Sequence, residues 1–268
     1  MQQQAVVAQQ FGNTASAYLT SSVHAQGADL VKLREMAAAL PKRPVVLDLG
    51  CGAGHASFAV APVAESVTAF DLSPEMLAVV AGAAQERGLQ NISTQQGNVA
   101  ILPFADASMC MVVTRFSAHH WLDVPAALRE VKRVLKPKGL FVIIDITAPE
   151  APLHDTTLQA VELLRDGSHV RDYRPSEWLQ MLSDAGFKAE RMDDWKLQMK
   201  FDDWTARMRT PAERVTAIRS LLRTAPEETR HYFAVQADDS FTIDSALFRA
   251  EHDFSDICQE RSQLRYQG

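Results

Sequence analysis

A glycine-rich segment in the first quarter of the chain could hold a small ligand. Residues 48–54 read Asp-Leu-Gly-Cys-Gly-Ala-Gly and lie between a short apolar run and a helical pattern. Three alternate glycines let the backbone turn sharply and approach a ligand closely, and they leave backbone N–H groups beside a helix N-terminus. The carboxylate of Asp48 would repel a phosphate at the mouth of this loop. The segment therefore predicts a site for a ligand with an amino group or a positive charge.

An acidic residue ends the next apolar run. Asp71 follows residues 66–70, and a carboxylate at this point of a nucleotide-binding fold can accept hydrogen bonds from both hydroxyls of a ribose. The alternative is that Asp71 caps the helix that begins there. Ser73, with Pro74 in the first helical position, is the better cap. We therefore expect Asp71 to serve a ligand.

Two further polar segments follow later apolar runs. Residues 97–99 read Gly-Asn-Val, and Asn98 could meet the amino group of an adenine, although Gly-Asn is also a common turn pair. Residues 115–121 read Arg-Phe-Ser-Ala-His-His-Trp. Such a loop can shape a substrate pocket, in which His119 or His120 could act in proton transfer. The alternative is a histidine pair with one member buried and hydrogen-bonded for structural reasons.

These segments depend on a regular alternation of apolar and helical patterns. The apolar runs are residues 45–49, 66–70, 92–96, 109–114 and 139–146. Between them, residues 56–64, 74–87 and 124–134 have helical spacing. Strands that alternate with helices predict an α/β fold, with a parallel sheet covered on both faces. Ligands bind to such sheets at the carboxyl ends of the strands, where the polar segments lie.

The flanking segments predict an arm, further helices and two more strands. Expected helices are residues 28–40, 153–165, 176–185, 202–209, 211–222 and 226–233, and expected strands are 188–200 and 242–248. The first 25 or so residues are polar and lack a strong helical stripe. We predict one domain over residues 1–268. It divides into an arm and helix (1–40), a ligand-binding core (41–150), substrate-side helices with C-terminal strands (151–250) and a tail (251–268).

Composition narrows the class of protein. The formal net charge of −6 and the lack of a Lys/Arg cluster argue against a nucleic acid as the main partner. Three cysteines without a CxxC spacing predict neither a disulfide framework nor a zinc site, and nothing else calls for a metal. Neither a signal-peptide pattern nor a membrane-length apolar run is present. The expected location is the cytoplasm, with no membrane partner.

Taken together, these motifs resemble a known enzyme family. The residues that carry the resemblance are 11–18, 48–54, 71–77, 102–104, 118–121 and 128–139. They are similar to class I S-adenosylmethionine (SAM)-dependent methyltransferases, and within these to the ubiquinone/menaquinone-biosynthesis C-methyltransferases. The resemblance covers roughly residues 10–195. It implies a Rossmann-like seven-stranded sheet of order 3-2-1-4-5-7-6 with the last strand antiparallel, and a helical insertion follows at residues 201–235.

The resemblance also implies which residues hold SAM. The expected cofactor contacts are Tyr18, Asp48, Gly50, Gly52, Asp71, Leu72, Met76, Asn98, Val99, Arg115 and Phe116. Asp48 and Gly50 would serve the methionine end, and Asp71 the ribose. Leu72 and Met76 would pack near the adenine, and Asn98 stands where the family often has Asp. Arg115 and Phe116 would lie beside the sulfonium, with Tyr18 closing over it.

The activity that follows is methyl transfer to a small-molecule acceptor, with carbon, oxygen and nitrogen acceptors left open. His119 and His120 are the catalytic candidates. One alternative is a protein that binds SAM or S-adenosylhomocysteine (SAH) without turnover. Another is a nicotinamide-dependent oxidoreductase, although the loop is Gly-x-Gly-x-Gly and not Gly-x-Gly-x-x-Gly. A monomer and a homodimer both fit. We further expect residues 1–25 to form a lid that orders with ligand, against the alternative of a permanently docked arm.

Overall fold

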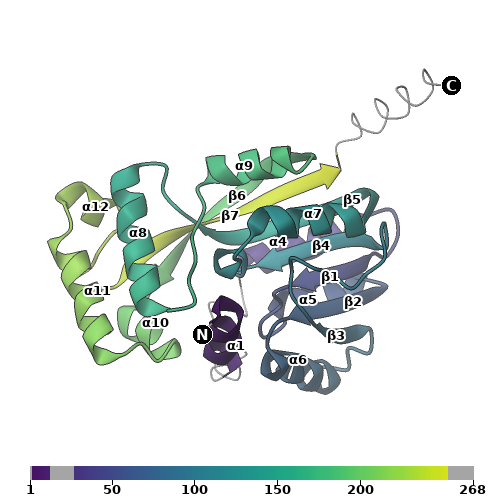
Figure 1. The fold of residues 1–268 in the computed structure, drawn as a ribbon, viewed down its shortest axis with the longest axis horizontal. Helices are drawn as coiled ribbons and strands as arrows, with labels where there is room; N and C mark the ends of the chain where they lie inside the picture. The colour runs from purple at the N-terminus through teal and green to yellow at the C-terminus, as the bar shows by residue number, and fades with distance from the viewer. Residues whose placement is uncertain (1, 13–26, 253–268) are drawn as a thin grey trace.

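A seven-stranded mixed sheet forms the centre of the protein (Figure 1). The computed structural model describes residues 2–12 and 27–252. The strands are β1 (Val45–Leu49), β2 (Ser66–Asp71), β3 (Ile92–Gln96), β4 (Met109–Arg115), β5 (Leu135–Thr147), β6 (Phe187–Met199) and β7 (Phe241–His252). Their order is β3-β2-β1-β4-β5-β7-β6, and β7 runs antiparallel to both β5 and β6. The predicted fold class and strand order are confirmed.

Helices cover both faces of the sheet. On one face, α4 (Ala28–Ala38) and α5 (His55–Val60) pack on the central strands through buried residues such as Leu33 and Val60. On the other face lie α7 (Val124–Val134) and α9 (Pro175–Asp184). The helix α6 (Pro74–Glu86) packs beside β2 and β3. Because β4 and β5 are covered on both sides, most of their side chains are buried, and the majority of these are apolar.

The antiparallel pair of β6 and β7 extends past the end of β5 and carries a third apolar cluster (Figure 1). Four helices pack there: α8 (Pro152–Arg165), α10 (Phe201–Arg207), α11 (Ala212–Thr224) and α12 (Glu227–Tyr232). Trp204 is 1% exposed at the centre of this cluster. The predicted helical insertion therefore lies beside the carboxyl end of β5, next to the expected ligand side of the sheet.

The N-terminal segment differs from its prediction. No helix was predicted within residues 1–25, but the structure has α1 (Gln3–Gly12) there. This helix lies between the insertion helices and the sheet (Figure 1). A short 3-10 turn, η2 (Ala118–His120), was also missed, and a second one, η1 (Ala61–Val63), ends the predicted helix 56–64 early. Tyr18 and the tail from residue 253 lie outside the described residues. Among the helices within 2–12 and 27–252, none has the length and apolar character needed to cross a membrane.

Candidate active site

The glycine loop after β1 takes backbone conformations that side chains disfavour. Gly50 and Gly52 have φ values of +63° and +49°, in the region that glycine reaches without steric cost. A Cβ on Gly50 would lie 1.8 Å from the Oγ of Ser117, whereas one on Gly52 would meet no atom within 4 Å. The first glycine therefore allows close packing, and the second leaves space at the loop surface for a ligand.

Asp71 ties this loop to the next one. Its Oδ2 accepts a hydrogen bond from the Gly52 N–H at 2.9 Å, and its Oδ1 accepts one from the Ser73 N–H at 2.9 Å. The hydroxyl of Ser73 accepts from Met76 N and caps α6, as predicted. Burial raises the pKa of Asp71, and the backbone donors oppose this. Each carboxylate oxygen has a second lone pair, so the group can still accept hydrogen bonds from a ligand.

Asp48 lies behind the glycine loop and not on a cavity wall. It is 1% exposed, and its Oδ2 accepts hydrogen bonds from the backbone N–H and hydroxyl of Ser57 at 2.9 and 2.6 Å. Burial raises its pKa to about 6, against the hydrogen bonds from Ser57. Its Oδ1 has no hydrogen-bond partner among the described residues. Asp48 therefore anchors the first turn of α5 beneath the loop, and its predicted contact with a ligand stays a prediction.

A cavity of about 280 Å³ opens above the loop at the carboxyl ends of β1, β2 and β3. Nine of the predicted site residues line it: Gly50, Gly52, Asp71, Leu72, Met76, Asn98, Val99, Phe116 and His120. We call this the first cavity. The Oδ1 of Asn98 accepts a hydrogen bond from the Ala100 N–H at 2.9 Å. Asn98 therefore forms the predicted turn, and the second lone pair of its Oδ1 could accept from an adenine amino group, a contact that stays a prediction.

Arg115 does not line the first cavity, contrary to the expectation that it lies beside the ligand. It is 9% exposed, and its guanidinium pairs with the carboxylate of Asp29 on α4 and lies 4.4 Å from the centroid of the Phe116 ring. A buried cation needs such a partner, and α4 supplies it from the opposite side of the sheet. Phe116 itself has a φ of +51°, and its side chain lines the first cavity.

A smaller cavity of about 70 Å³ adjoins the first. The two share the side chains of Phe11, Phe116 and His120. The other residues that line this second cavity are His119, Ile146, Glu162, Arg165, Asp166, Asp172, Leu197, Met199, Trp204, Arg207 and Ile243. They come from η2, the end of β5, α8, the loop between α8 and α9, β6, α10 and β7. The lining of the second cavity thus combines apolar side chains with acids and bases.

His119 is held by a buried carboxylate at this second cavity. Its Nδ1 donates to Asp145 Oδ1 at 2.7 Å, and Asp145, 1% exposed, also accepts from the backbone N–H of Ala118 at 2.8 Å. Burial alone lowers the pKa of His119, but the charge and hydrogen bond of Asp145 reverse this and raise it to about 9. A buried acid that fixes a ring nitrogen and favours the imidazolium is the arrangement used in acid–base catalysis.

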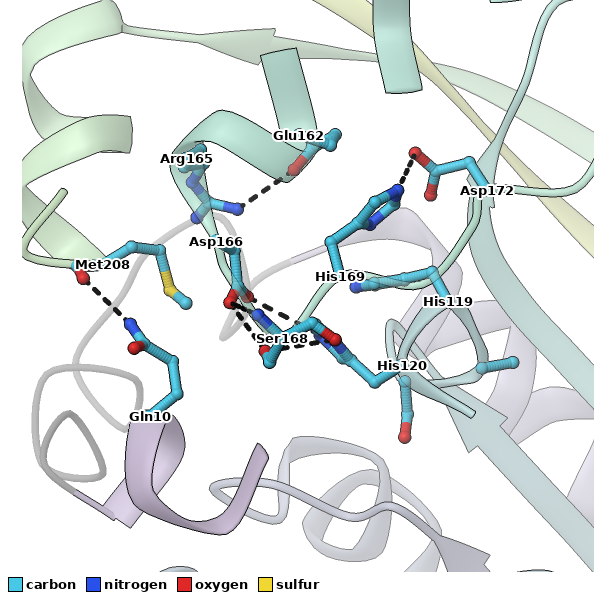
Figure 2. Close-up of polar contacts among 12 residues, drawn as sticks. Gln10, His119, His120, Glu162, Arg165, Asp166, Ser168, His169, Asp172 and Met208 are labelled. Atoms are coloured by element: carbon cyan, nitrogen blue, oxygen red, sulfur yellow. Dashed lines mark hydrogen bonds and ion pairs between the residues drawn. The ribbon is translucent and has the colours of Figure 1, made fainter. Parts of the chain in front are cut away.

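His120 has a different environment from its neighbour. Its Nδ1 donates to the carbonyl of Ser168 at 3.2 Å (Figure 2), and its ring meets that of Phe11 edge-on with the ring centroids 4.9 Å apart. Burial, and then the charge of His119, lower its pKa to about 4. The two predicted catalytic histidines are therefore adjacent but chemically unlike, the first favouring its cation and the second its neutral form.

Sequence reasoning missed two acids at this site. Asp145 is an acid within the apolar run 139–146, and this interruption could have indicated a functional residue. Asp172 lies in the loop between α8 and α9, 3.9 Å from Nε2 of His169 (Figure 2), and no local sequence pattern indicates its role. It is 1% exposed, and neither of its oxygens has a hydrogen-bond partner within the described part of the chain. Burial raises its pKa well above the usual value.

The helix α1 covers both cavities. Gln3, Gln4, Val7 and Phe11 line the first, and Phe11 also lines the second. Gln3 donates to the Ser168 carbonyl at 2.6 Å, and Gln10 donates to the Met208 carbonyl at 2.9 Å (Figure 2). The N-terminal segment therefore lies where a lid was predicted, although Tyr18 falls outside the described residues.

Comparisons with known proteins agree with this geometry. Residues 47–143 match the methyltransferase domain family. The chain is 48% identical to the uncharacterized protein YafE of Escherichia coli over 201 residues, 75% of this chain and 97% of that protein. It is 38% identical to the uncharacterized methyltransferase YcgJ of Bacillus subtilis, over 84% of this chain and 88% of that protein. The crystal structure of YcgJ has a TM-score of 0.79, with 36% identity, over 83% of this chain and 97% of that one.

The predicted branch is also found. A demethylmenaquinone methyltransferase of Chlorobaculum parvum is 37% identical over 114 residues, 42% of this chain and 45% of that protein. That likeness is limited to less than half of either chain, whereas the likeness to YcgJ extends over most of both. The glycine loop and Asp71, which line the first cavity, lie within the matched segment. The chain therefore belongs to the methyltransferase domain family.

Proposed function

We propose that the protein transfers the methyl group of SAM to a small-molecule acceptor, with the cofactor in the first cavity and the acceptor in the second. The observation that supports this proposal is the shared wall of Phe116 and His120 between the two cavities. A methyl group must pass directly from one molecule to the other, so the two reactants need adjoining sites that exclude water.

The residues of the first cavity fit the cofactor in size and chemistry. Asp71 would accept the ribose hydroxyls with the lone pairs that Gly52 and Ser73 leave open. Leu72, Met76 and Val99 would pack against the adenine. When bound, SAM supplies a methyl group already activated by its sulfonium. Gly50 and Gly52 would let the methionine end approach the backbone, above the buried carboxylate of Asp48.

The acids and bases that line the second cavity would bind and orient the acceptor. His119 lines this cavity and is fixed by Asp145 through Nδ1, so the proposed catalytic role falls on His119. His120 forms the passage between the cavities and would position the acceptor beside the methyl group. Phe11 on α1 would keep water away from both.

Incubation with methyl-labelled SAM and fractionated metabolite extracts tests the proposal. We expect label in a small molecule and one SAH formed per methyl transferred. His119→Gln should lower turnover by about 10²- to 10³-fold, the usual cost of removing one preorganised donor to a reacting oxygen. His154→Gln is the matched control, because His154 bonds to Thr229 and lines neither cavity. If the chain binds SAH but transfers no label with any fraction, a SAM-binding protein without turnover is favoured. If the wild-type chain does not bind SAH, the cofactor assignment is refuted.

A further inference from the structure

The second cavity carries two proton-bearing groups that the family match does not assign. We propose that His119 and Asp172 together form an oxyanion site, and that the methyl acceptor is a small molecule bearing an acidic hydroxyl, bound there as its anion. This inference rests on the function proposed above and adds the chemical class of the acceptor.

Asp172 is the first part of the site. Its carboxyl group is 1% exposed, lines the second cavity, and has no hydrogen-bond partner on either oxygen among the described residues. His169 Nε2 lies 3.9 Å from Asp172 Oδ2, beyond hydrogen-bond distance (Figure 2), and is already 3.0 Å from the Gln159 side-chain oxygen. A buried polar group without a partner carries a large desolvation cost. A ligand atom in the cavity would supply the missing partner.

Asp172 is also poised to act as a donor. Burial raises its pKa well above the usual value, and the nearby carboxylates of Glu162, Asp145 and Asp155 raise it further, against the charge of His119. A carboxylic acid kept protonated in an apolar site can donate its O–H to a developing oxyanion. Asp172 would therefore offer a proton, and not a negative charge, to the acceptor.

His119 is the second part of the site. Its Nδ1 is occupied by Asp145 at 2.7 Å, so the ring meets the second cavity with its other edge. The carboxylates of Asp145 on β5 and Glu162 on α8 favour its cation, against the effect of burial. An imidazolium is a charge-assisted donor, which binds an anionic oxygen about twice as strongly as a neutral donor does.

The rest of the cavity favours an uncharged hydroxyl compound over an amine. Arg165 and Arg207 contribute guanidinium groups to the lining, and Glu162 and Asp166 contribute carboxyl groups, with Arg165 paired to Glu162 at 3.4 Å. The imidazolium of His119 would repel an ammonium group placed beside it. The lining also has apolar side chains, against which a ring or short chain would pack: Ile146, Leu197, Met199, Trp204 and Ile243. The sulfonium of the neighbouring reactant would further favour an anion at this place.

The transfer step balances with these groups. The hydroxyl proton of the acceptor passes to solvent, because His119 already carries its own proton. A lone pair of the acceptor oxygen forms the new bond to the methyl carbon, while the electron pair of the carbon–sulfur bond returns to sulfur. One ether, one SAH and one proton result. His119 and Asp172 keep their protons and stabilise the oxyanion before transfer.

The test uses 4-nitrophenol, whose anion absorbs visible light and whose neutral form does not. The full chain, saturated with SAH, is titrated with the dye at a pH below the dye's own pKa. We expect the bound dye to absorb as its anion, which corresponds to a pKa lowered by at least about one unit, a tenfold shift in ionisation. His119→Gln should abolish the anion signal, and Asp172→Asn should reduce it. His154→Gln should leave it unchanged.

Each outcome decides the proposal. Dye bound to the wild-type chain in its neutral form, or an anion signal that survives in His119→Gln, would overturn the oxyanion site. Failure of the dye to bind to the SAH-saturated wild-type chain would also overturn the oxyanion site. An SAH-induced thermal shift in every variant shows that folding and the first cavity are intact. If the wild-type chain gives no such shift, the proposed function fails first and this inference fails with it.

Discussion

The two cavities differ in how the chain builds them. The first is made largely from the loops that follow β1, β2, β3 and β4, so most of its polar residues other than Gln3 and Gln4 of α1 lie within a few positions of a strand end. The second draws residues from η2, β5, α8, the loop before α9, β6, α10 and β7, which are spread over more than a hundred positions. The comparison indicates that the strand-end loops of the fold build the proposed cofactor site, whereas the proposed acceptor site depends on the packing of many distant elements.

The largest expected effect tests the cofactor side. Asp71→Ala should lower the affinity for SAH by about 10²-fold or more, because two charge-assisted hydrogen bonds of roughly 1.5–3 kcal/mol each are lost. The loop should also loosen, since Asp71 accepts from Gly52 N. Calorimetric titration measures the affinity, and circular dichroism checks the fold. Asp71→Asn should be milder, because it keeps an acceptor oxygen. Unchanged affinity in the alanine variant would leave Asp71 with a structural role only.

This difference between the cavities also explains what the sequence could predict. Gly50, Gly52 and Asp71 were found because a parallel strand fixes where its next few residues lie. The strand order followed from the family resemblance. Asp172 could not be found, since its position beside His119 depends on how α8 packs against the end of β5.

Errors at single residues have the same physical cause. Arg115 follows β4 as predicted, but α4 provides Asp29 as its partner and holds it away from the cavities. The helix α1 was missed because its residues show little amphipathic pattern; its packing over the cavities, and not its own sequence, accounts for its helical form. Contacts between distant elements decide such cases, and a single sequence does not reveal them.

A second prediction, of intermediate size, tests the acceptor side through pH. The folded-state pKa of His119 is raised from 6.5 to about 9. Its contribution to stability should therefore be fully present below pH 6.5 and be lost as the pH rises through 9, with an amplitude on the order of 3 kcal/mol. Urea unfolding of the wild-type chain and His119→Gln, from pH 6 to 10, measures the difference between them. Asp145→Asn should remove the same dependence, and a constant difference across this range would contradict the His119–Asp145 pair.

The smallest expected effect concerns α1, which belongs to both cavities. Ten residues are too few for a stable isolated helix, and the polar contacts of α1 include hydrogen bonds from Gln3 and Gln10 to backbone carbonyls. A ligand beneath the helix would add contacts with Val7 and Phe11. Amide exchange in residues 3–12 should therefore slow by about tenfold when SAH is bound, which is about 1.4 kcal/mol. The helix α9 also has ten residues and lines neither cavity, so it is the internal control. Strong and equal protection of α1 with and without SAH would show a permanently docked arm, and water exclusion from the two cavities would then need no closing motion.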